Sequence, residues 1–304
     1  MNEQAKNISL PGLILPKPPL PASEPAPSSA GAANLQPVAE LPELGVPLVF
    51  VTGGKGGVGK SSMALNLAVE LGKRGRRVLL VDLDLGLGNL AVMMKVKVQR
   101  NVEDYLDGTA PLTSCVTRVG GGVDLLAGSA GSGELARPDS ARRARLFQGL
   151  REAAPHYDLV LADGAAGIGP DVLAFAGSAD FVLAVATPEP ASVTDIYGIL
   201  KAIDSWSREQ GIEVPTPGVL FNRVSGPAEA NSLLAKLAGV TRRFLSRSPR
   251  LVGWVPESRS VRDAVQAQRP FVQTEPRALA AQCIGRLAAR IEALVGLDSE
   301  KLTG

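Results

Sequence analysis

A glycine-rich loop between a strand-like and a helix-like segment constrains the fold of this chain more than any other feature. The apolar run Leu48 to Thr52 leads into Gly54-Lys55-Gly56-Gly57-Val58-Gly59-Lys60-Ser61, and helical periodicity begins at Ser61. The loop has the Gly-x-x-x-x-Gly-Lys-Ser pattern of a phosphate-binding loop, in the strand-loop-helix context that such a loop requires. Its glycines allow backbone N–H groups to converge on phosphate oxygens, and the helix directs its positive end at the same place. The sequence therefore predicts a nucleoside triphosphate site.

The residues of this loop have separate expected roles. Lys60 is expected to neutralise the β and γ phosphates, and the Ser61 hydroxyl to ligate Mg²⁺. An ordinary glycine-rich turn is a poor alternative because several glycines cost conformational entropy at a helix entry. A dinucleotide site is also disfavoured, since a Lys-Ser ending serves phosphoryl chemistry and Mg²⁺. The expected nucleotide contacts in this part of the chain are Gly54, Lys55, Gly56, Gly57, Val58, Gly59, Lys60, Ser61 and Ser62.

Short apolar runs alternate with longer helical segments from Pro47 onward, which predicts an α/β fold with a largely parallel sheet covered on both faces. The expected strands are residues 48–52, 78–82, 159–163, 181–187, 218–222 and 251–255. The expected helices are residues 61–74, 141–153, 192–210, 228–237 and 277–295.

Three carboxylates follow two of these strands. Asp82 and Asp84 follow the apolar run of the second expected strand, and Asp163 follows that of the third. Strand ends meet the ligand at one edge of such a sheet, so these groups are expected to support Mg²⁺ and to position water. Capping of turns or helices is the alternative role.

Composition narrows the class of protein further. Residues 1–45 hold nine of the 23 prolines and are expected to form a flexible or polyproline-like tail before a domain at residues 46–297 and a short tail at 298–304. No apolar run reaches the roughly 20 residues of a bilayer-spanning helix, so a cytoplasmic location is expected. The distant Cys115 and Cys283 and the single His156 disfavour a disulfide framework, a zinc or iron-sulfur site and a Ser-His-Asp triad.

Lys55 extends the loop to Lys-Gly-Gly-Val-Gly-Lys-Ser, which resembles the deviant Walker A signature of the ParA/MinD superfamily. The resemblance spans roughly residues 47–295. Residues 82–90 resemble switch I, and residues 163–168 resemble Walker B and switch II. The run Thr187 to Asp195 is similar to the MinD and FlhG branch, in which FlhG proteins regulate flagellar number and placement. The resemblance implies a doubly wound P-loop ATPase and an ATP-dependent sandwich dimer in which slow hydrolysis acts as a timer.

The same resemblance implies roles for individual residues. Lys55 would reach the nucleotide of the partner subunit, and Asp84 would orient the hydrolytic water. Asp82 and Asp163 would support Mg²⁺ and the switches. The adenine pocket would involve Asn222, with Pro256 and Glu257 as part of its wall.

The chain departs from the family pattern at three positions. Gly164 stands where relatives usually have a hydroxyl residue, which is expected to loosen switch II. Ala91 and Lys95 replace the usual Asp and Gly after switch I. An altered surface towards an activator is therefore expected, with the ATP site intact.

Residues 277–295 leave two roles open. Their apolar residues form one helical face, which fits a terminal core helix best, although MinD and FlhG proteins often bind membrane with such a helix. A peripheral position at the inner face of the membrane is therefore a second possibility beside a purely cytoplasmic one.

The partner also stays open. A ParA-like nucleoid-binding partition ATPase is the alternative function, because a group of arginines could bind DNA. The ordinary role of such a group is a solvated surface. Its residues are Arg242, Arg243, Arg247, Arg250, Arg259 and Arg262. An iron-sulfur scaffold ATPase is disfavoured because Cys-x-x-Cys is missing. Glu3-Gln4-Ala5 faintly resembles the motif with which FlhG proteins stimulate the GTPase FlhF. An FlhF-like GTPase is thus one candidate beside an unknown activator or cargo.

Overall fold

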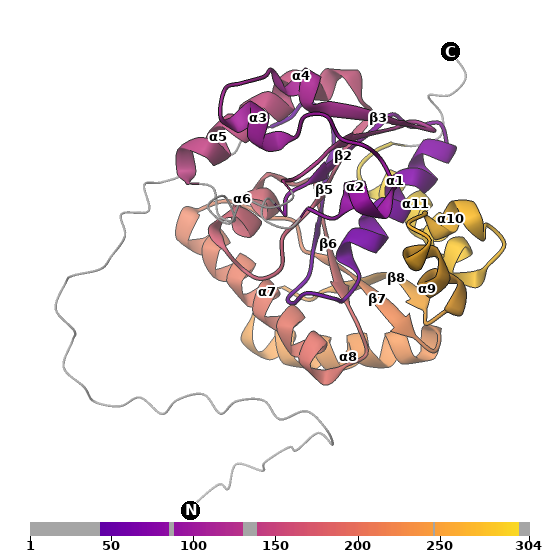
Figure 1. Ribbon diagram of the computed structural model, residues 1–304. Coiled ribbons are helices and arrows are strands. Elements are labelled where there is room, and N and C mark those ends of the chain that lie inside the picture. Colours follow the sequence, from indigo (N-terminus) through magenta and orange to yellow (C-terminus); the bar gives the residue numbers. More distant parts are fainter. Residues whose placement is uncertain (1–42, 85–87, 130–138, 246, 298–304) are drawn as a thin grey trace, which may run out of the picture.

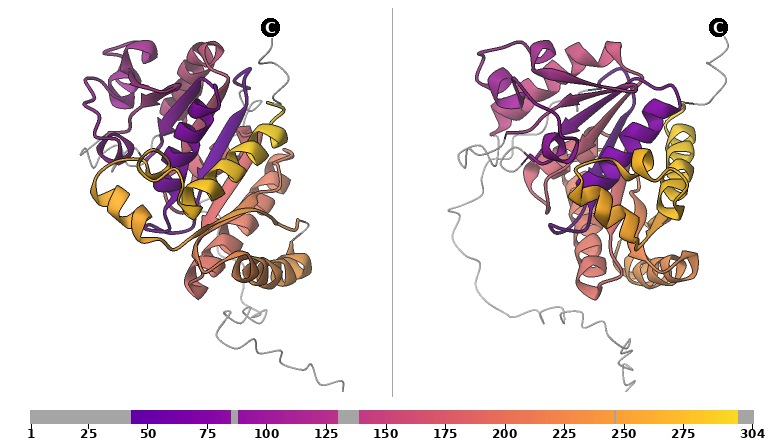
Figure 2. Two further views of the ribbon diagram at one scale, coloured as in Figure 1. Left: turned by 90° about the vertical axis from the view of Figure 1, so that its right-hand side faces the viewer. Right: turned by 45° about the vertical axis from the view of Figure 1, so that its right-hand side comes forward.

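The computed structural model describes residues 43–84, 88–129, 139–245 and 247–297. The expected tails lie outside these ranges, apart from residues 43–45, and so do the Glu3-Gln4-Ala5 motif and residues 85–87 of the expected switch I. Within the described ranges, helices cover both faces of one central sheet (Figures 1 and 2).

The sheet contains eight strands in the order β3-β4-β2-β5-β1-β6-β7-β8. Every neighbouring pair is parallel except β3 and β4, which are antiparallel. The strands are β1 (Leu48–Thr52), β2 (Val78–Asp82), β3 (Val116–Gly120), β4 (Val123–Leu126), β5 (Leu159–Asp163), β6 (Phe181–Ala186), β7 (Gly218–Val224) and β8 (Arg250–Pro256). The predicted doubly wound, mostly parallel α/β fold is confirmed.

Helices follow most of the strands. The longer ones are α1 (Lys60–Lys73), α5 (Ser140–Ala153), α6 (Pro170–Ser178), α7 (Pro190–Gln210), α8 (Pro227–Phe244), α9 (Arg259–Gln266) and α11 (Leu279–Leu294). The short ones are α2 (Leu90–Met93), α3 (Val102–Leu106), α4 (Leu112–Cys115), the 3₁₀ turn η1 (Ala154–His156) and α10 (Phe271–Thr274). The five expected helices correspond to α1, α5, α7, α8 and α11.

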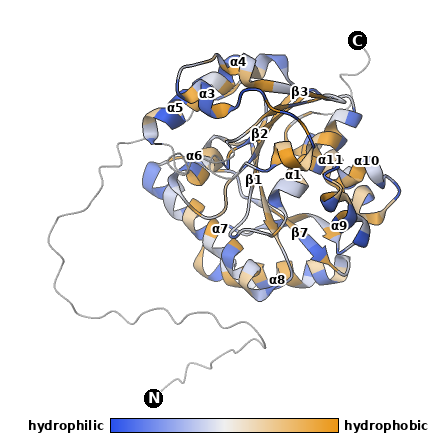
Figure 3. Cartoon of the chain, in the orientation of Figure 1, coloured by the Kyte–Doolittle hydropathy of each residue, from blue (hydrophilic) through white to orange (hydrophobic). Residues whose placement is uncertain are grey.

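The sheet divides the core into two layers because alternate residues of each strand point to opposite faces. Val49 and Val51 of β1 pack in the layer with α1 and α11, whereas Phe50 packs in the layer with α5 to α8. The central strands β1, β2 and β5 are buried at every position, as expected for strands covered on both faces. In Figure 3 the hydrophobic colour is concentrated along the strands and on the inner sides of the helices.

Helix α11 is part of this core. It packs against β8 and α1, and its apolar residues Ile284, Leu287 and Ile291 are buried. Its Glu292 is 4% exposed and accepts hydrogen bonds from Nε of Arg74 and Nε of Arg76, both at 2.6 Å. The expected core role of this segment is confirmed. Among the described residues, no helix has the length and apolarity that a membrane crossing needs.

Candidate nucleotide site

The glycine-rich loop connects β1 to α1 at the carboxyl edge of the sheet. Gly57 and Gly59 have φ angles of 83° and 98°, a conformation that glycine adopts without a Cβ penalty, and Gly59 is the N-cap of α1. Gly54 is required for a different reason. A Cβ there would lie 2.2 Å from Cβ of Asp195, so the loop passes directly against α7. The predicted strand-loop-helix unit is present.

Lys60 begins α1 and is largely buried, with 8% of its surface exposed. Its Nζ lies 3.4 Å from the backbone oxygen of Lys55. Burial lowers the pKa of Lys60, while the negative charges of Asp163 and Asp84 act in the opposite direction. The fold therefore places this lysine among carboxylates that the sequence separates by about 25 and 100 residues, as expected for a shared site.

Lys55 extends along a different path. Its Nζ forms an ion pair of 2.7 Å with Oε2 of Glu189, the N-cap residue of α7 in the same subunit. The hydrogen bond and charge of Lys55 lower the pKa of Glu189. Both side chains are exposed, by 37% and 58%. Glu189 had no expected role, although it lies in the run that resembles MinD and FlhG.

Asp82 and Asp163 end adjacent parallel strands and are direct neighbours in the register of β2 and β5. Both are 1% exposed, and burial raises the pKa of Asp82 to about 6 and of Asp163 to about 7. Asp82 accepts hydrogen bonds from the backbone N–H of Asp84 and of Leu90, both at 3.1 Å. It thus holds residues at both ends of the expected switch I loop. This contact corresponds to the capping role that the sequence left open beside support of Mg²⁺.

The remaining oxygen atoms of the site suit a magnesium ion that is bound together with phosphate. The Ser61 hydroxyl is hydrogen-bonded to Asp163, and Oδ1 of Asp163 and Oγ of Ser62 are buried without a hydrogen-bond partner in the described part of the chain. Within that part, no group of three His, Cys, Asp or Glu could hold a metal by itself. Mg²⁺ commonly relies on one or two protein oxygens, with phosphate and water completing its shell.

A pocket of about 670 Å³ opens beside the loop. Its lining includes Gly57, Gly59, Lys60, Ser61 and Ser62, together with the expected base residues Asn222, Pro256 and Glu257. Gly54, Lys55, Gly56, Val58 and the three carboxylates are not part of this lining. The pocket therefore runs from a phosphate side, at the loop, to a base side, at Asn222, Pro256 and Glu257.

Two elements in the pocket wall had no expected role. Helix α9 contributes Val261 and Val265, one helical turn apart, and α2 contributes Val92 and Met93. The i, i+4 spacing of the valines is the sequence signal that could have indicated an apolar wall.

The departure at Lys95 falls at a position with a left-handed backbone. Lys95 has a φ angle of 57°, the left-handed conformation that favours glycine. The loop after α2 therefore keeps a glycine-like geometry in this chain.

Asn222 joins the two sides of the site. Its side chain is 5% exposed, and its Nδ2 donates to the backbone oxygen of Val58 at 2.9 Å. This orientation turns the amide oxygen, an acceptor, away from Val58. An acceptor suits the exocyclic amino group of adenine, whereas guanine carries an oxygen at that ring position.

Asn222→Asp is expected to weaken ATP binding on the order of tenfold, because a carboxylate cannot donate to the Val58 oxygen and leaves it unsatisfied. Calorimetric titration with ATP measures this effect. The control is Asn231→Asp on the exposed side of α8, which should bind like the parent. Equal affinities for both variants would contradict the role of Asn222.

The phosphate-binding loop lies at the carboxyl edge of a parallel sheet, its buried lysine lies beside strand-end carboxylates, and a pocket joins the loop to the expected base residues. This arrangement defines a P-loop nucleotide-binding protein. The chain belongs to the CobQ/CobB/MinD/ParA nucleotide binding domain family, whose model matches residues 49–271.

Flagellar and cell-division proteins are among its relatives. The antiactivator FleN of Pseudomonas aeruginosa is 36% identical over 247 residues, covering 81% of this chain and 86% of FleN. The flagellum site-determining protein YlxH of Helicobacter pylori is 30% identical over 241 residues, covering 79% of this chain and 80% of YlxH. The septum site-determining protein MinD of Pyrococcus horikoshii, complexed with Mg-ADP, shares the fold with a TM-score of 0.67 and 24% identity, over 83% of this chain and 98% of that one.

These comparisons confirm the expected family branch and, with it, the expected class, an ATPase that uses ATP and Mg²⁺. The ParA-like partition alternative is less supported, since the flagellar and MinD proteins are the more similar relatives.

Proposed function

We propose that this chain is an ATP-dependent, dimerising switch ATPase of the FlhG/MinD type that acts in flagellar number or placement. The observation that carries the ATPase is the buried amine of Lys60 beside Asp84 and Asp163 at the phosphate-binding loop. The flagellar role is supported by the similarity to FleN and YlxH, whose names describe an antiactivator and a flagellum site-determining protein. The proline-rich tail, the ATPase domain at 46–297 and the short C-terminal tail are the proposed organisation.

The phosphate side of the site would bind ATP through the backbone N–H groups of residues 54–62 and the ammonium of Lys60. Bound Mg²⁺ would supply charge neutralisation on the β and γ phosphates. Asp84 would orient the attacking water, and this role is supported by the interaction of its charge with those of Lys60 and Asp163. Asp163 and Ser61 would hold the metal, and Asp82 would fix the loop that carries Asp84.

Lys55 would act on the nucleotide of a second copy. In the subunit described here it is bound to its own Glu189, but an ion pair as exposed as this one contributes little to stability. A phosphate in the partner subunit can therefore compete for this lysine. We infer that dimer formation exchanges the Glu189 contact for a contact with the partner's ATP.

Lys55→Ala is expected to abolish ATP-dependent dimerisation while a single subunit still binds nucleotide, because Lys60 and the loop amides remain. Light scattering with a non-hydrolysable ATP analogue gives the molecular mass, and calorimetry gives the affinity. Lys236→Ala, at an exposed position of α8, serves as the matched control and should dimerise like the parent. Persistent dimers of Lys55→Ala would exclude the proposed role in trans.

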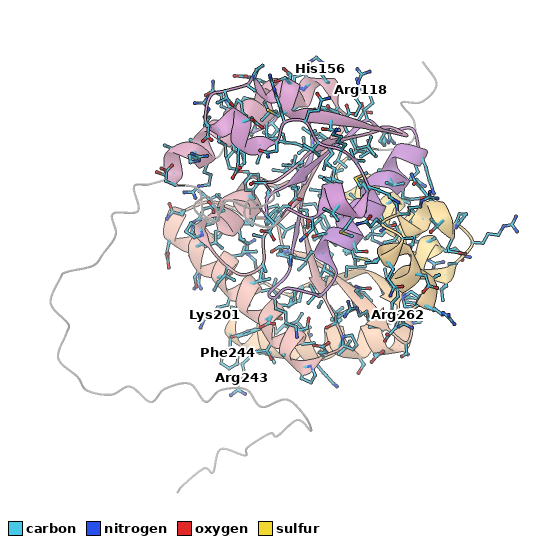
Figure 4. All side chains as sticks on the ribbon, viewed as in Figure 1. Arg118, His156, Lys201, Arg243, Phe244 and Arg262 are labelled. Carbon is cyan, nitrogen blue, oxygen red and sulfur yellow. The ribbon has the colours of Figure 1, made fainter. Side chains whose placement is uncertain are left out.

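The structure says less about the cellular surface, nucleoid or membrane, on which such a switch would act. Of the six arginines in the basic region, Arg247 pairs with Asp204, Arg259 with Asp263 and Arg262 with Glu257. Arg243 and Arg262 also point outward at well-separated places in Figure 4. This compensation and dispersal disfavour a single DNA-binding face.

The partners we propose are a second copy in the ATP state and an activator or cargo protein, with an FlhF-like GTPase as one candidate. Peripheral membrane contact is a further part of the proposal, but the apolar face of α11 is already buried in the core. Such a contact would need another surface or a rearranged α11. A pull-down with an ATP-locked variant, repeated with liposomes and with DNA, distinguishes these partners.

A further inference from the structure

Gly164, the first residue after Asp163, lies directly against the ring of Phe50 on β1. A Cβ at this position would be 2.6 Å from both Cε2 and Cζ of Phe50 and 2.8 Å from the backbone oxygen of Val51. These separations are too short for any side chain to be accommodated without movement of the ring or of β1. The space that the missing hydroxyl residue would occupy is therefore filled rather than left loose.

The backbone at Gly164 does not itself demand glycine. Its φ angle lies outside the left-handed region, unlike that of Gly167, which is 102° with open space around its Cβ position. The backbone N–H of Gly164 donates to the oxygen of Val51 at 2.8 Å, an ordinary extension of the sheet. The aromatic ring and the adjacent strand are thus what exclude a side chain at this point.

Phe50 also contacts the element beyond the switch II segment. Its ring stacks on Phe175 of α6 with a centroid separation of 5.9 Å, and Phe175 stacks on Phe147 of α5 at 4.4 Å. Phe50 is completely buried. One ring on the strand that leads into the phosphate-binding loop therefore touches both ends of the segment from Gly164 to α6.

The far end of this segment has a second attachment. Asp171, in the first turn of α6, is bound by Arg143 of α5. Because α5 and α6 are also joined through the stacked rings, the start of α6 cannot shift without moving Phe175 against Phe50. Displacement of the ring is consequently transmitted to the backbone that carries Asp163.

We propose that Phe50 is a positioning residue for ATP hydrolysis and that Gly164 is its obligatory small partner. The ring sets the position of the backbone that follows Asp163, and with it the place of that carboxylate relative to Lys60. This inference rests on the proposed ATPase function. The rate of hydrolysis would then depend on the contact between Phe50 and Gly164, neither of which touches nucleotide or metal.

A packing role alone and a positioning role differ in what a mutation changes. Loss of core packing lowers the free energy of unfolding, but it leaves the turnover of the folded protein as it was. Misplacement of Asp163 lowers kcat while nucleotide affinity, which depends on the loop amides and Lys60, stays close to that of the parent.

The experiment compares Gly164→Ala, Phe50→Leu and the double variant with Gly169→Ala as control. Gly169 lies in the same segment, has a φ angle of −66° and has nothing within 4 Å of its Cβ position. Gly164→Ala should lower kcat roughly tenfold with ADP affinity within about twofold of the parent. Phe50→Leu in the same chain should recover most of that loss, because the smaller side chain makes room for the methyl group. Gly169→Ala should turn over like the parent.

Hydrogen exchange of the amides from Gly164 to Ser178 in the nucleotide-free protein supplies a readout that needs no hydrolysis. Gly164→Ala should exchange faster there, and the double variant should return towards the parent. A double variant as slow as Gly164→Ala, or parental turnover and exchange in Gly164→Ala, overturns the inference. If the parent itself hydrolyses no ATP, the proposed function fails, and the inference about turnover fails with it, whereas the exchange data still report whether Phe50 and Gly164 are coupled.

Discussion

Lys60→Ala is expected to lose high-affinity ATP binding, with an increase in Kd on the order of 100-fold, the scale of truncating one partner of a buried charge pair. Lys60 is almost completely buried, and its amine lies near the carboxylates of Asp163 and Asp84. The variant therefore loses the cation that faces the β and γ phosphates and keeps two negative charges beside them. Calorimetric titration with ATP and Mg²⁺ measures the effect.

Lys201→Ala provides the matched control for this experiment. Lys201 is exposed on α7 and extends from the surface in Figure 4, so its loss should leave the affinity unchanged. Parental ATP affinity in Lys60→Ala would contradict the assignment of the phosphate-binding loop.

Asp84→Ala is expected to separate binding from turnover. The variant should bind ATP and form the dimer, because the loop amides and Lys60 are intact, yet hydrolyse on the order of 100-fold more slowly, the scale of losing a positioned catalytic group. The interaction of Asp84 with the charges of Lys60 and Asp163 places it at the phosphate side of the site. A phosphate-release assay combined with light scattering measures both properties on one sample.

Asp263→Ala is the control for Asp84→Ala, since Asp263 is an exposed carboxylate of α9 that pairs with Arg259. Parental hydrolysis in Asp84→Ala, also in the presence of an activating partner, would leave Asp84 as a structural residue of the switch I loop. Loss of ATP binding in the same variant would likewise contradict the proposed division of roles.

The fold was predictable where burial is complete. The strands β1, β2 and β5 have the predicted bounds because continuous apolar runs mark strands that are covered on both faces. The hairpin of β3 and β4 was missed because β3 lies at the edge of the sheet and is partly exposed, so that it has no apolar run. Its signal was the turn at Gly120-Gly121-Gly122, where all three φ angles are positive.

The predictable part of the site consists of the residues that belong to a local sequence motif or end a predicted strand. The loop, Lys60 and the strand-end carboxylates follow from one strand-loop-helix pattern and from the rule that parallel strands end at one edge. The ion pair between Lys55 and Glu189, the wall formed by α9 and the fit of Phe50 against Gly164 depend on packing between segments that are far apart in the chain. Sequence spacing carries no information about such fits.

The anchoring of Glu292 between Arg74 and Arg76 has a consequence for the order in which the protein is made. Helix α11 covers α1 and β8, and its Glu292 carboxylate neutralises two guanidinium groups between α1 and β2, more than 200 residues earlier in the chain. During synthesis the side of α1 that packs against α11 stays uncovered until α11 has left the ribosome. Contacts that form late between residues far apart in the chain slow folding, and they prolong the time during which exposed apolar surface can aggregate. The nascent protein is therefore expected to depend on chaperones until α11 has emerged.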